Sequence, residues 1–240
     1  MAPASTPPTP ASRDAGMILV DTADPRAIDR ALAFPAISGF TTNPTLIARA
    51  AGVTALSLAD YVAAGADLCR FAAARAGVRH VMIQAVGEPH RALDQARAWR
   101  DALTPATHAR LWVKLPPMPG HVALCGDLAR LGCASLVTAV FTAAQAEVAL
   151  GAGADGVAIY FGRLTRDTAD GEAVVARIAH CVRRAEKMLL LASLANAALI
   201  ENALAYSADM TLPPDMLDSL LAAPGSTRAM SEFDAAVRLP

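Results

Sequence analysis

A single lysine lies inside one of the most apolar runs of the sequence. Lys114 is the fourth residue of LWVKL, although the chain contains only one other lysine, Lys187, among 21 lysines and arginines. Lysine is rarely buried without a partner, and burial lowers its pKa from an ordinary value of about 10.4. A neutral amine can attack a carbonyl carbon and form a Schiff base, so Lys114 is a candidate nucleophile. The spacing is equally compatible with an amine that reaches solvent or pairs with Asp21.

Polar residues also stand at the ends of the other short apolar runs. They are Asp21, Thr41, Thr42, Asn43, Gln84, Thr138, Tyr160 with Arg163 just beyond it, Ser193 and Thr211. Carboxylate, amide, phenol and guanidinium groups around an amine can hold a polar substrate and move protons. Each could instead be a core or turn residue; Asp21, for example, could cap the helix that follows it.

Eight apolar runs and the helical segments between them predict the elements that position these residues. The runs cover residues 17–22, 36–40, 80–86, 111–115, 134–140, 156–160, 188–193 and 208–212. Most are continuous rather than alternating, which is typical of parallel strands covered on both faces. Eight βα units in roughly 220 residues predict an α/β fold of the (β/α)8 TIM-barrel class, which builds its sites at the C-terminal ends of its strands. An open doubly wound sheet is the alternative, but the first run ends in DTADP, without a glycine-rich turn.

Composition and motifs argue against several other classes of protein. The formal net charge is −1 and no basic stripe is present, so no nucleic-acid partner is expected. Residues 151–156, GAGADG, match GxGxxG but follow a helical segment and precede a strand-like run, the reverse of a dinucleotide site. The cysteines and histidines lack metal-ligand spacing, so we expect no metal and no cofactor. The longest apolar stretch is too short to span a bilayer, and no membrane partner is expected.

The chain is expected to form one domain with a short tail. Residues 1–16 are rich in Pro, Ser and Ala and lack the apolar core of a signal peptide, which predicts a flexible N-terminal tail and a cytoplasmic protein. Residues 17–240 are expected to form a single barrel domain with a C-terminal helix.

Several blocks resemble the transaldolase family in its small-subunit branch, and most closely its fructose-6-phosphate aldolases. They are VDTAD, GFTTNPTLI, WVKLP, VTAVFTAAQA, AGADGVAIYFGR, LLLAS and MTLPPDML, in family order from about residue 17 to about residue 233. The resemblance implies a (β/α)8 barrel with a Schiff-base lysine on the fourth strand. It also implies a ketose or sugar phosphate and an aldehyde as substrates, and a homo-oligomer, a pentamer or decamer.

The resemblance further implies roles for most of these polar residues. Lys114 would be the nucleophile, Asp21 would help proton transfer, Thr138 would position a water, Thr42 and Asn43 would hold the donor, and Arg163 and Ser193 would bind a phosphate. After Ser193 the chain reads LANA where the family often has a basic residue, which favours weaker phosphate binding.

Gln84 and Tyr160 distinguish the possible reactions. Transaldolases of the family resemble one another in having Glu and Phe at these positions, whereas the aldolase branch has Gln and Tyr. The implied function is therefore a class I aldolase acting on the C3–C4 bond of a ketose with a dihydroxyacetone-type donor. One alternative is a transaldolase that moves a dihydroxyacetone unit between sugar phosphates. Another is a non-catalytic sugar-phosphate-binding barrel, against which the retained Lys114 argues.

Overall fold

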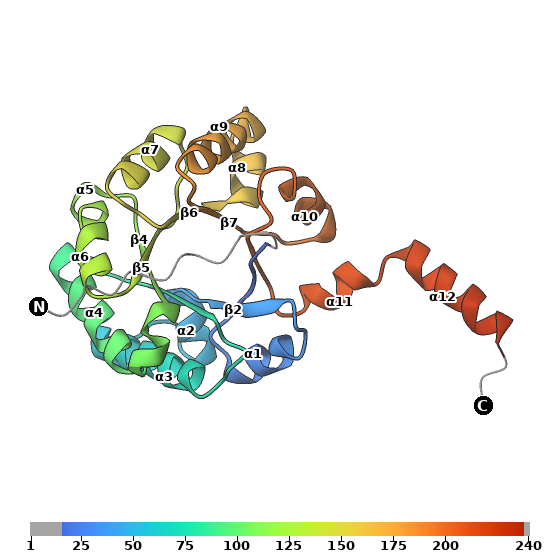
Figure 1. Cartoon of the computed structure of the whole chain (residues 1–240), viewed down its shortest axis with the longest axis horizontal. Coiled ribbons are helices and arrows are strands. Elements are labelled where there is room, and N and C mark those ends of the chain that lie inside the picture. The colour runs from blue at the N-terminus through green and yellow to red at the C-terminus, as the bar shows by residue number, and fades with distance from the viewer. Residues whose placement is uncertain (1–15, 238–240) are drawn as a thin grey trace, which may run out of the picture.

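Eight parallel strands close into a barrel, and they follow one another around it in sequence order (Figure 1). The structure, a computed structural model, describes residues 16–237, so the predicted N-terminal tail lies outside the described residues apart from Gly16. The strands are β1 (Ile18–Asp21), β2 (Ile37–Thr41), β3 (His80–Gln84), β4 (Leu111–Leu115), β5 (Ala134–Val137), β6 (Gly156–Tyr160), β7 (Met188–Ala192) and β8 (Met210–Leu212). The predicted (β/α)8 class is therefore confirmed.

Helices surround the barrel and cover the outer face of the sheet (Figure 1). They are α1 (Pro25–Leu32), α2 (Pro44–Ala50), α3 (Leu58–Ala73), α4 (Pro89–Asp101), α5 (Pro119–Val122), α6 (Cys125–Arg130), α7 (Ala143–Gly151), α8 (Phe161–Asp167), α9 (Gly171–Arg184), α10 (Ala197–Ala203), α11 (Met216–Leu221) and α12 (Pro224–Ala236), with a 3₁₀ helix, η1 (Pro105–Arg110). Every residue of β2 and β4 is buried, as expected for parallel strands that are covered on both faces.

An apolar layer fills the interior of the barrel below the mouth. It comprises Leu19, Met82, Trp112, Leu136, Ala158, Met188 and Leu190. Side chains alternate along a strand, so the residues two positions after five of these also point into the barrel, one layer closer to its C-terminal end. They are Asp21, Gln84, Lys114, Thr138 and Tyr160. A polar layer therefore lies on an apolar floor.

The turns at both ends of the barrel follow from local sequence. Asp24 and Asn43 cap α1 and α2 by accepting hydrogen bonds from the backbone N–H groups of Arg26 and Leu46, and a proline follows each cap. The glycines of GAGADG end α7 at Gly151 and turn the chain into β6, with Gly153 at φ +89°. The motif therefore lies between a helix and a strand, as its sequence context predicts.

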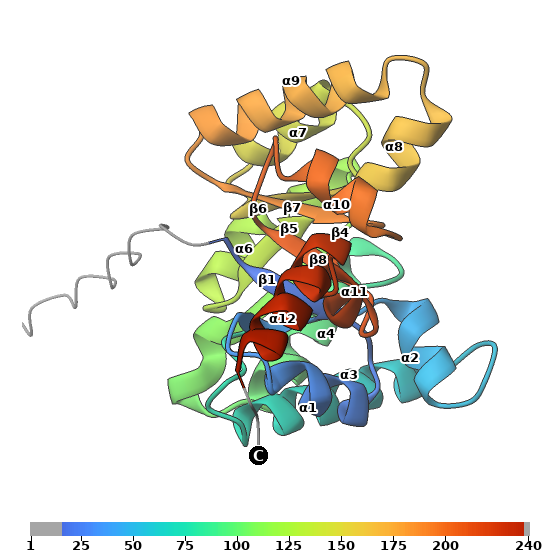
Figure 2. The same ribbon diagram turned by 90° about the vertical axis from the view of Figure 1, so that its right-hand side faces the viewer.

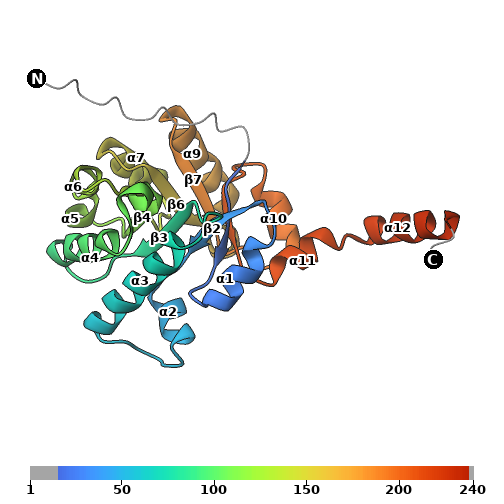
Figure 3. The same cartoon turned by 60° about the horizontal axis from the view of Figure 1, so that its bottom comes forward.

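The last helix leaves the barrel. Helix α12 extends away from the rest of the chain, and none of its residues is buried (Figures 1 and 3). Figure 2 looks along this extension toward the barrel. Met230 and Phe233 are 55% and 63% exposed on it. Among residues 16–237, no helix has both the length and the apolar character needed to cross a lipid bilayer.

Candidate active site

Lys114 lies inside the barrel, near the C-terminal end of β4. Its side chain is 6% exposed, and Nζ donates a hydrogen bond of 3.0 Å to the backbone carbonyl of Thr42. Among the described residues, the amine forms no ion pair with Asp21 or with any other carboxylate. The lysine therefore neither reaches solvent nor forms the ion pair that its sequence position allows.

The surroundings of Lys114 favour its neutral form. Burial lowers the pKa of the amine, and the negative charge of Asp21 opposes this with a smaller effect. The net direction is downward, so a larger fraction of the amine is unprotonated near neutral pH than for an exposed lysine. This is the state that can attack a carbonyl carbon.

We expect the pH profile of turnover to reflect this lowered pKa. On the acidic side, kcat/KM should rise with pH as Lys114 loses its proton, with a midpoint below the ordinary lysine value of about 10.4. The profile should be measured in a single mixed buffer at constant ionic strength, with stability checked at each pH. A midpoint at or above the ordinary lysine value would contradict a desolvated nucleophile.

Asp21 is held by a chain of hydroxyl groups. Thr41 Oγ1 donates to Asp21 Oδ1 at 2.6 Å and lies 2.7 Å from Thr211 Oγ1. Capping of α1 belongs to Asp24, so Asp21 does not have the alternative role that its sequence position allows. Thr41 and Thr211 stand at strand ends in the sequence, but no role is predicted for either. The structure places them as the residues that orient the carboxylate of Asp21.

Four of the predicted site residues line one pocket of about 420 Å³ at the mouth of the barrel. They are Asn43, Gln84, Tyr160 and Arg163, joined by Pro44, Thr45 and Leu46. The guanidinium carbon of Arg163 lies 4.7 Å from the centre of the Tyr160 ring, and Phe141 meets the same ring edge-on at 6.0 Å. The Asn43 side-chain oxygen caps α2, which leaves its NH2 group as a donor toward a ligand.

The remaining predicted residues lie around this pocket without lining it. Lys114 pairs in register with Gln84, and its amine reaches the residue before Asn43. Thr138 is 1% exposed and directly follows β5. Asp21 lines a neighbouring pocket of about 550 Å³, which shares Leu46 with the first.

The observed features of Thr42 and Ser193 involve backbone atoms rather than their side-chain hydroxyl groups. The Thr42 hydroxyl is buried and has no hydrogen-bond partner among the described residues, so its observed contact with Lys114 is through its carbonyl. Ser193 has φ +64°, a conformation that non-glycine residues rarely adopt and that often accompanies a functional site. Its carbonyl packs so closely against Gly162, next to Arg163, that a Cβ at Gly162 would lie 2.3 Å from it.

One residue of this region has no signal in the local sequence. The Tyr61 hydroxyl, on α3, donates a hydrogen bond of 2.5 Å to the backbone carbonyl of Gln84. Burial raises the pKa of Tyr61, so the phenol remains a donor. Only the packing of α3 against β3 brings the two residues together. Within residues 16–237, no group of three or more histidine, cysteine, aspartate or glutamate side chains is arranged to hold a metal ion.

Together, the closed barrel and the polar layer at its mouth define a (β/α)8-barrel protein with a candidate active site at the C-terminal ends of its strands. The chain belongs to the transaldolase/fructose-6-phosphate aldolase family, whose sequence profile matches residues 18–238. It is 30% identical to a probable transaldolase of Rhodospirillum centenum, over 89% of this chain and 87% of that protein. It is 27% identical to a probable transaldolase of Geobacter sulfurreducens, over 89% and 94% of the two chains.

Two further proteins are similar to the chain, one over a smaller part of its length and one at lower sequence identity. A probable fructose-6-phosphate aldolase of Streptococcus pneumoniae is 30% identical over 51% of this chain and 57% of that protein. The crystal structure of 2,3-dimethylmalate lyase superposes with a TM-score of 0.60 at 13% identity, over 95% of this chain and 86% of that one. At this identity the second similarity shows the fold alone.

Proposed function

We propose that the protein is a class I aldolase that cleaves or forms the C3–C4 bond of a ketose or ketose phosphate through a Schiff base on Lys114. The observation that carries the proposal is a lysine amine, 6% exposed and with a lowered pKa, inside a barrel mouth that also holds Asp21. The donor fragment would be of the dihydroxyacetone type. The setting suits this chemistry because a desolvated amine is a nucleophile and its protonated iminium is an electron sink.

In the proposed reaction, Lys114 Nζ attacks the ketone carbon, and the carbinolamine loses water to form an iminium ion. The hydroxyl group on C4 then loses its proton, the C3–C4 bond breaks, and its electron pair moves toward the iminium nitrogen. An aldehyde leaves and an enamine remains on Lys114. Protonation of the enamine carbon and hydrolysis by water release the donor fragment and restore the amine. Asp21 would bind substrate hydroxyl groups and assist the transfer of protons.

The remaining residues would bind and orient the substrate. Asn43 would donate from its free NH2 group to a donor hydroxyl, with Thr42 beside it. Thr138 would position a catalytic water. Arg163 would bind a phosphate or another anionic end of the substrate in the pocket it lines, with Ser193 nearby. Tyr160 would protonate the enamine, directly or through a water shared with Gln84 and Thr138.

A transaldolase is the second candidate function, and the names of the two relatives similar over most of the chain favour it. Gln84 and Tyr160, which line the same pocket, favour the aldolase. The two reactions differ in the fate of the enamine: an aldolase protonates it, whereas a transaldolase keeps it for an acceptor aldehyde. A barrel that binds sugar phosphates without turnover would perform neither reaction.

An assay without acceptor separates these functions. We expect the protein to release glyceraldehyde 3-phosphate from fructose 6-phosphate through many turnovers with no acceptor present. A coupled dehydrogenase assay would measure the release. Release that stops at one equivalent and resumes with erythrose 4-phosphate would establish the transaldolase instead. Absence of turnover under both conditions would contradict both enzymatic functions for this substrate.

We also propose that the protein forms a homo-oligomer, a pentamer or decamer. Helix α12 supports this proposal because it is isolated from the barrel and carries Met230 and Phe233 exposed. A second copy of the chain is a partner that could cover these side chains. Small molecules, a ketose or sugar phosphate and an aldehyde, are the other proposed partners.

A further inference from the structure

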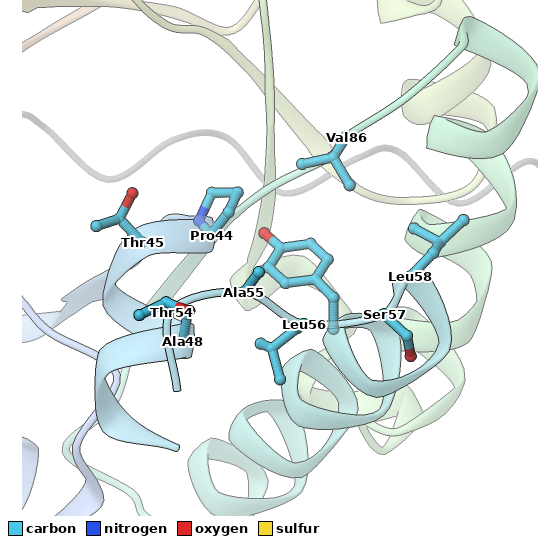
Figure 4. A pocket seen from close by; sticks show the side chains of 10 residues that line it. Pro44, Thr45, Ala48, Thr54, Ala55, Leu56, Ser57, Leu58 and Val86 are labelled. Atoms are coloured by element: carbon cyan, nitrogen blue, oxygen red, sulfur yellow. The ribbon is translucent and has the colours of Figure 1, made fainter. Parts of the chain in front are cut away.

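A further pocket of about 420 Å³, named the second pocket, lies directly beside the pocket that is lined by Gln84, Tyr160 and Arg163 (Figure 4). Pro44 and Thr45 line both pockets, so the two spaces meet at the start of α2. In Figure 4, Pro44 and Thr45 stand on one side of the second pocket, Leu58 on the other side, and Val86 above. The size is in the range of small-molecule pockets, about 300 to 1,000 Å³.

The lining of the second pocket is mostly apolar and carries no charged side chain. Its apolar residues are Pro44, Ala48, Ala55, Leu56, Leu58 and Val86. The pocket with Gln84 and Tyr160 instead contains Arg163, and the pocket at Asp21 contains both acidic and basic side chains. Of the three neighbouring spaces, the second pocket is therefore the one suited to an uncharged group.

Two of the four polar residues in this wall, Ser57 and Tyr61, are already engaged in hydrogen bonds, and the other two, Thr45 and Thr54, are uncharged. Ser57 Oγ donates to Asp60 Oδ2 at 2.7 Å and accepts from the Asp60 backbone N–H at 3.1 Å. The Tyr61 hydroxyl donates to the Gln84 carbonyl. An apolar group in the pocket would consequently leave these hydrogen bonds intact, whereas an anion would find no cation there.

We propose that this pocket binds an uncharged apolar substituent, aliphatic or aryl, of the aldehyde that the enzyme joins to its donor. The inference rests on the aldolase or transaldolase chemistry proposed for Lys114. The enamine carbon would attack the aldehyde carbon, a new C–C bond would form, and the aldehyde oxygen would take up a proton to become a hydroxyl group. Water would then hydrolyse the iminium and release the product. The substituent would lie across Pro44 and Thr45, in the pocket that Arg163 does not line.

The test is a series of straight-chain aldehydes, from acetaldehyde to hexanal, with dihydroxyacetone as the donor and the full-length protein. We expect kcat/KM for the aldehyde to rise about twofold to fourfold for each added methylene until the pocket is filled. Two variants of the wall, Ala55→Trp and Ala55→Asp, should abolish this rise by filling or charging the space. Val53→Trp is the matched control, because Val53 is in the same loop, is 46% exposed and does not line the pocket.

The outcomes separate this inference from the proposed function. A dependence on chain length that the Ala55 variants remove and Val53→Trp retains supports the pocket as a subsite. Equal rates along the series, or a rise that both Ala55 variants preserve, overturn the inference, while cleavage of fructose 6-phosphate in the same preparation leaves the proposed function intact. Absence of turnover with every donor and aldehyde overturns both.

Discussion

Replacing Lys114 with methionine will reduce aldol cleavage and synthesis by at least about 10⁴-fold, as expected for the loss of a covalent nucleophile. The other lysine of the sequence, Lys187, cannot substitute, because it directly precedes β7, at the opposite end of the barrel, where it contacts Asp155. Activity is measured as kcat/KM for fructose 6-phosphate. In parallel, borohydride and dihydroxyacetone should leave a reduced adduct on the Lys114 peptide of the wild-type protein, and no adduct on the variant.

The same substitution should leave the fold intact. Methionine nearly matches the length of lysine and removes a buried amine, which favours the folded state. It also leaves the Thr42 carbonyl without its donor, which costs about 1–3 kcal/mol. These effects oppose each other, so we expect the free energy of unfolding near neutral pH to change by less than about 2 kcal/mol. Denaturant unfolding of both proteins measures this change.

The pH dependence of stability provides a second measurement on the same pair. The pKa of Lys114 is lower in the folded state than in the unfolded state, so the unfolded chain binds more protons between the two values. Stability of the wild-type protein should therefore rise with pH from the folded-state pKa up to about 10.4, relative to the methionine variant.

A residual activity of the Lys114→Met variant near the wild-type level, or an adduct on Lys187, would refute the role given to Lys114.

The barrel could be predicted because burial on both faces leaves a strong signal in the sequence. Strands β4 and β6 begin and end at the predicted residues, within LWVKL and GVAIY. Two of the predictions that ran too long fail for a local reason: β7 stops before Ser193 at φ +64°, and β5 stops short of Ala139 at φ +58°. A residue with a left-handed backbone conformation cannot continue a strand. Neither Ser nor Ala is a residue type that predicts this conformation.

The candidate site, like the fold, could be predicted from the sequence only in part. Residues that point into the barrel follow from the two-residue period of a strand, which is why Gln84 and Tyr160 line one pocket. The hydrogen bond from Tyr61 to Gln84, and the apolar pocket beside it, depend on where α3 and the 51–57 loop pack. Those contacts join residues far apart in the chain, so no spacing within the sequence could predict them.

Tyr160→Phe will reduce the acceptor-free release of glyceraldehyde 3-phosphate by about 10²–10³-fold, as expected for the loss of a general acid. Transfer of the donor to an added aldehyde will be retained to within about tenfold, because protonation of the enamine is no part of that transfer. Phenylalanine keeps the ring that contacts Arg163 and Phe141 and removes only the hydroxyl group. The substitution therefore tests proton transfer by the Tyr160 hydroxyl group while the packing of the ring is kept.

The two rates are compared in one preparation, with fructose 6-phosphate as donor and erythrose 4-phosphate present or absent. Tyr206→Phe is the matched control, since Tyr206 packs against Phe161 and does not line the pocket. A selective loss of release would place Tyr160 after formation of the enamine, at the branch where an aldolase and a transaldolase diverge. An equal loss of both rates would place it earlier, in formation of the Schiff base or cleavage of the C–C bond. In that case, the presence of the Tyr160 hydroxyl group would not distinguish an aldolase from a transaldolase in this barrel.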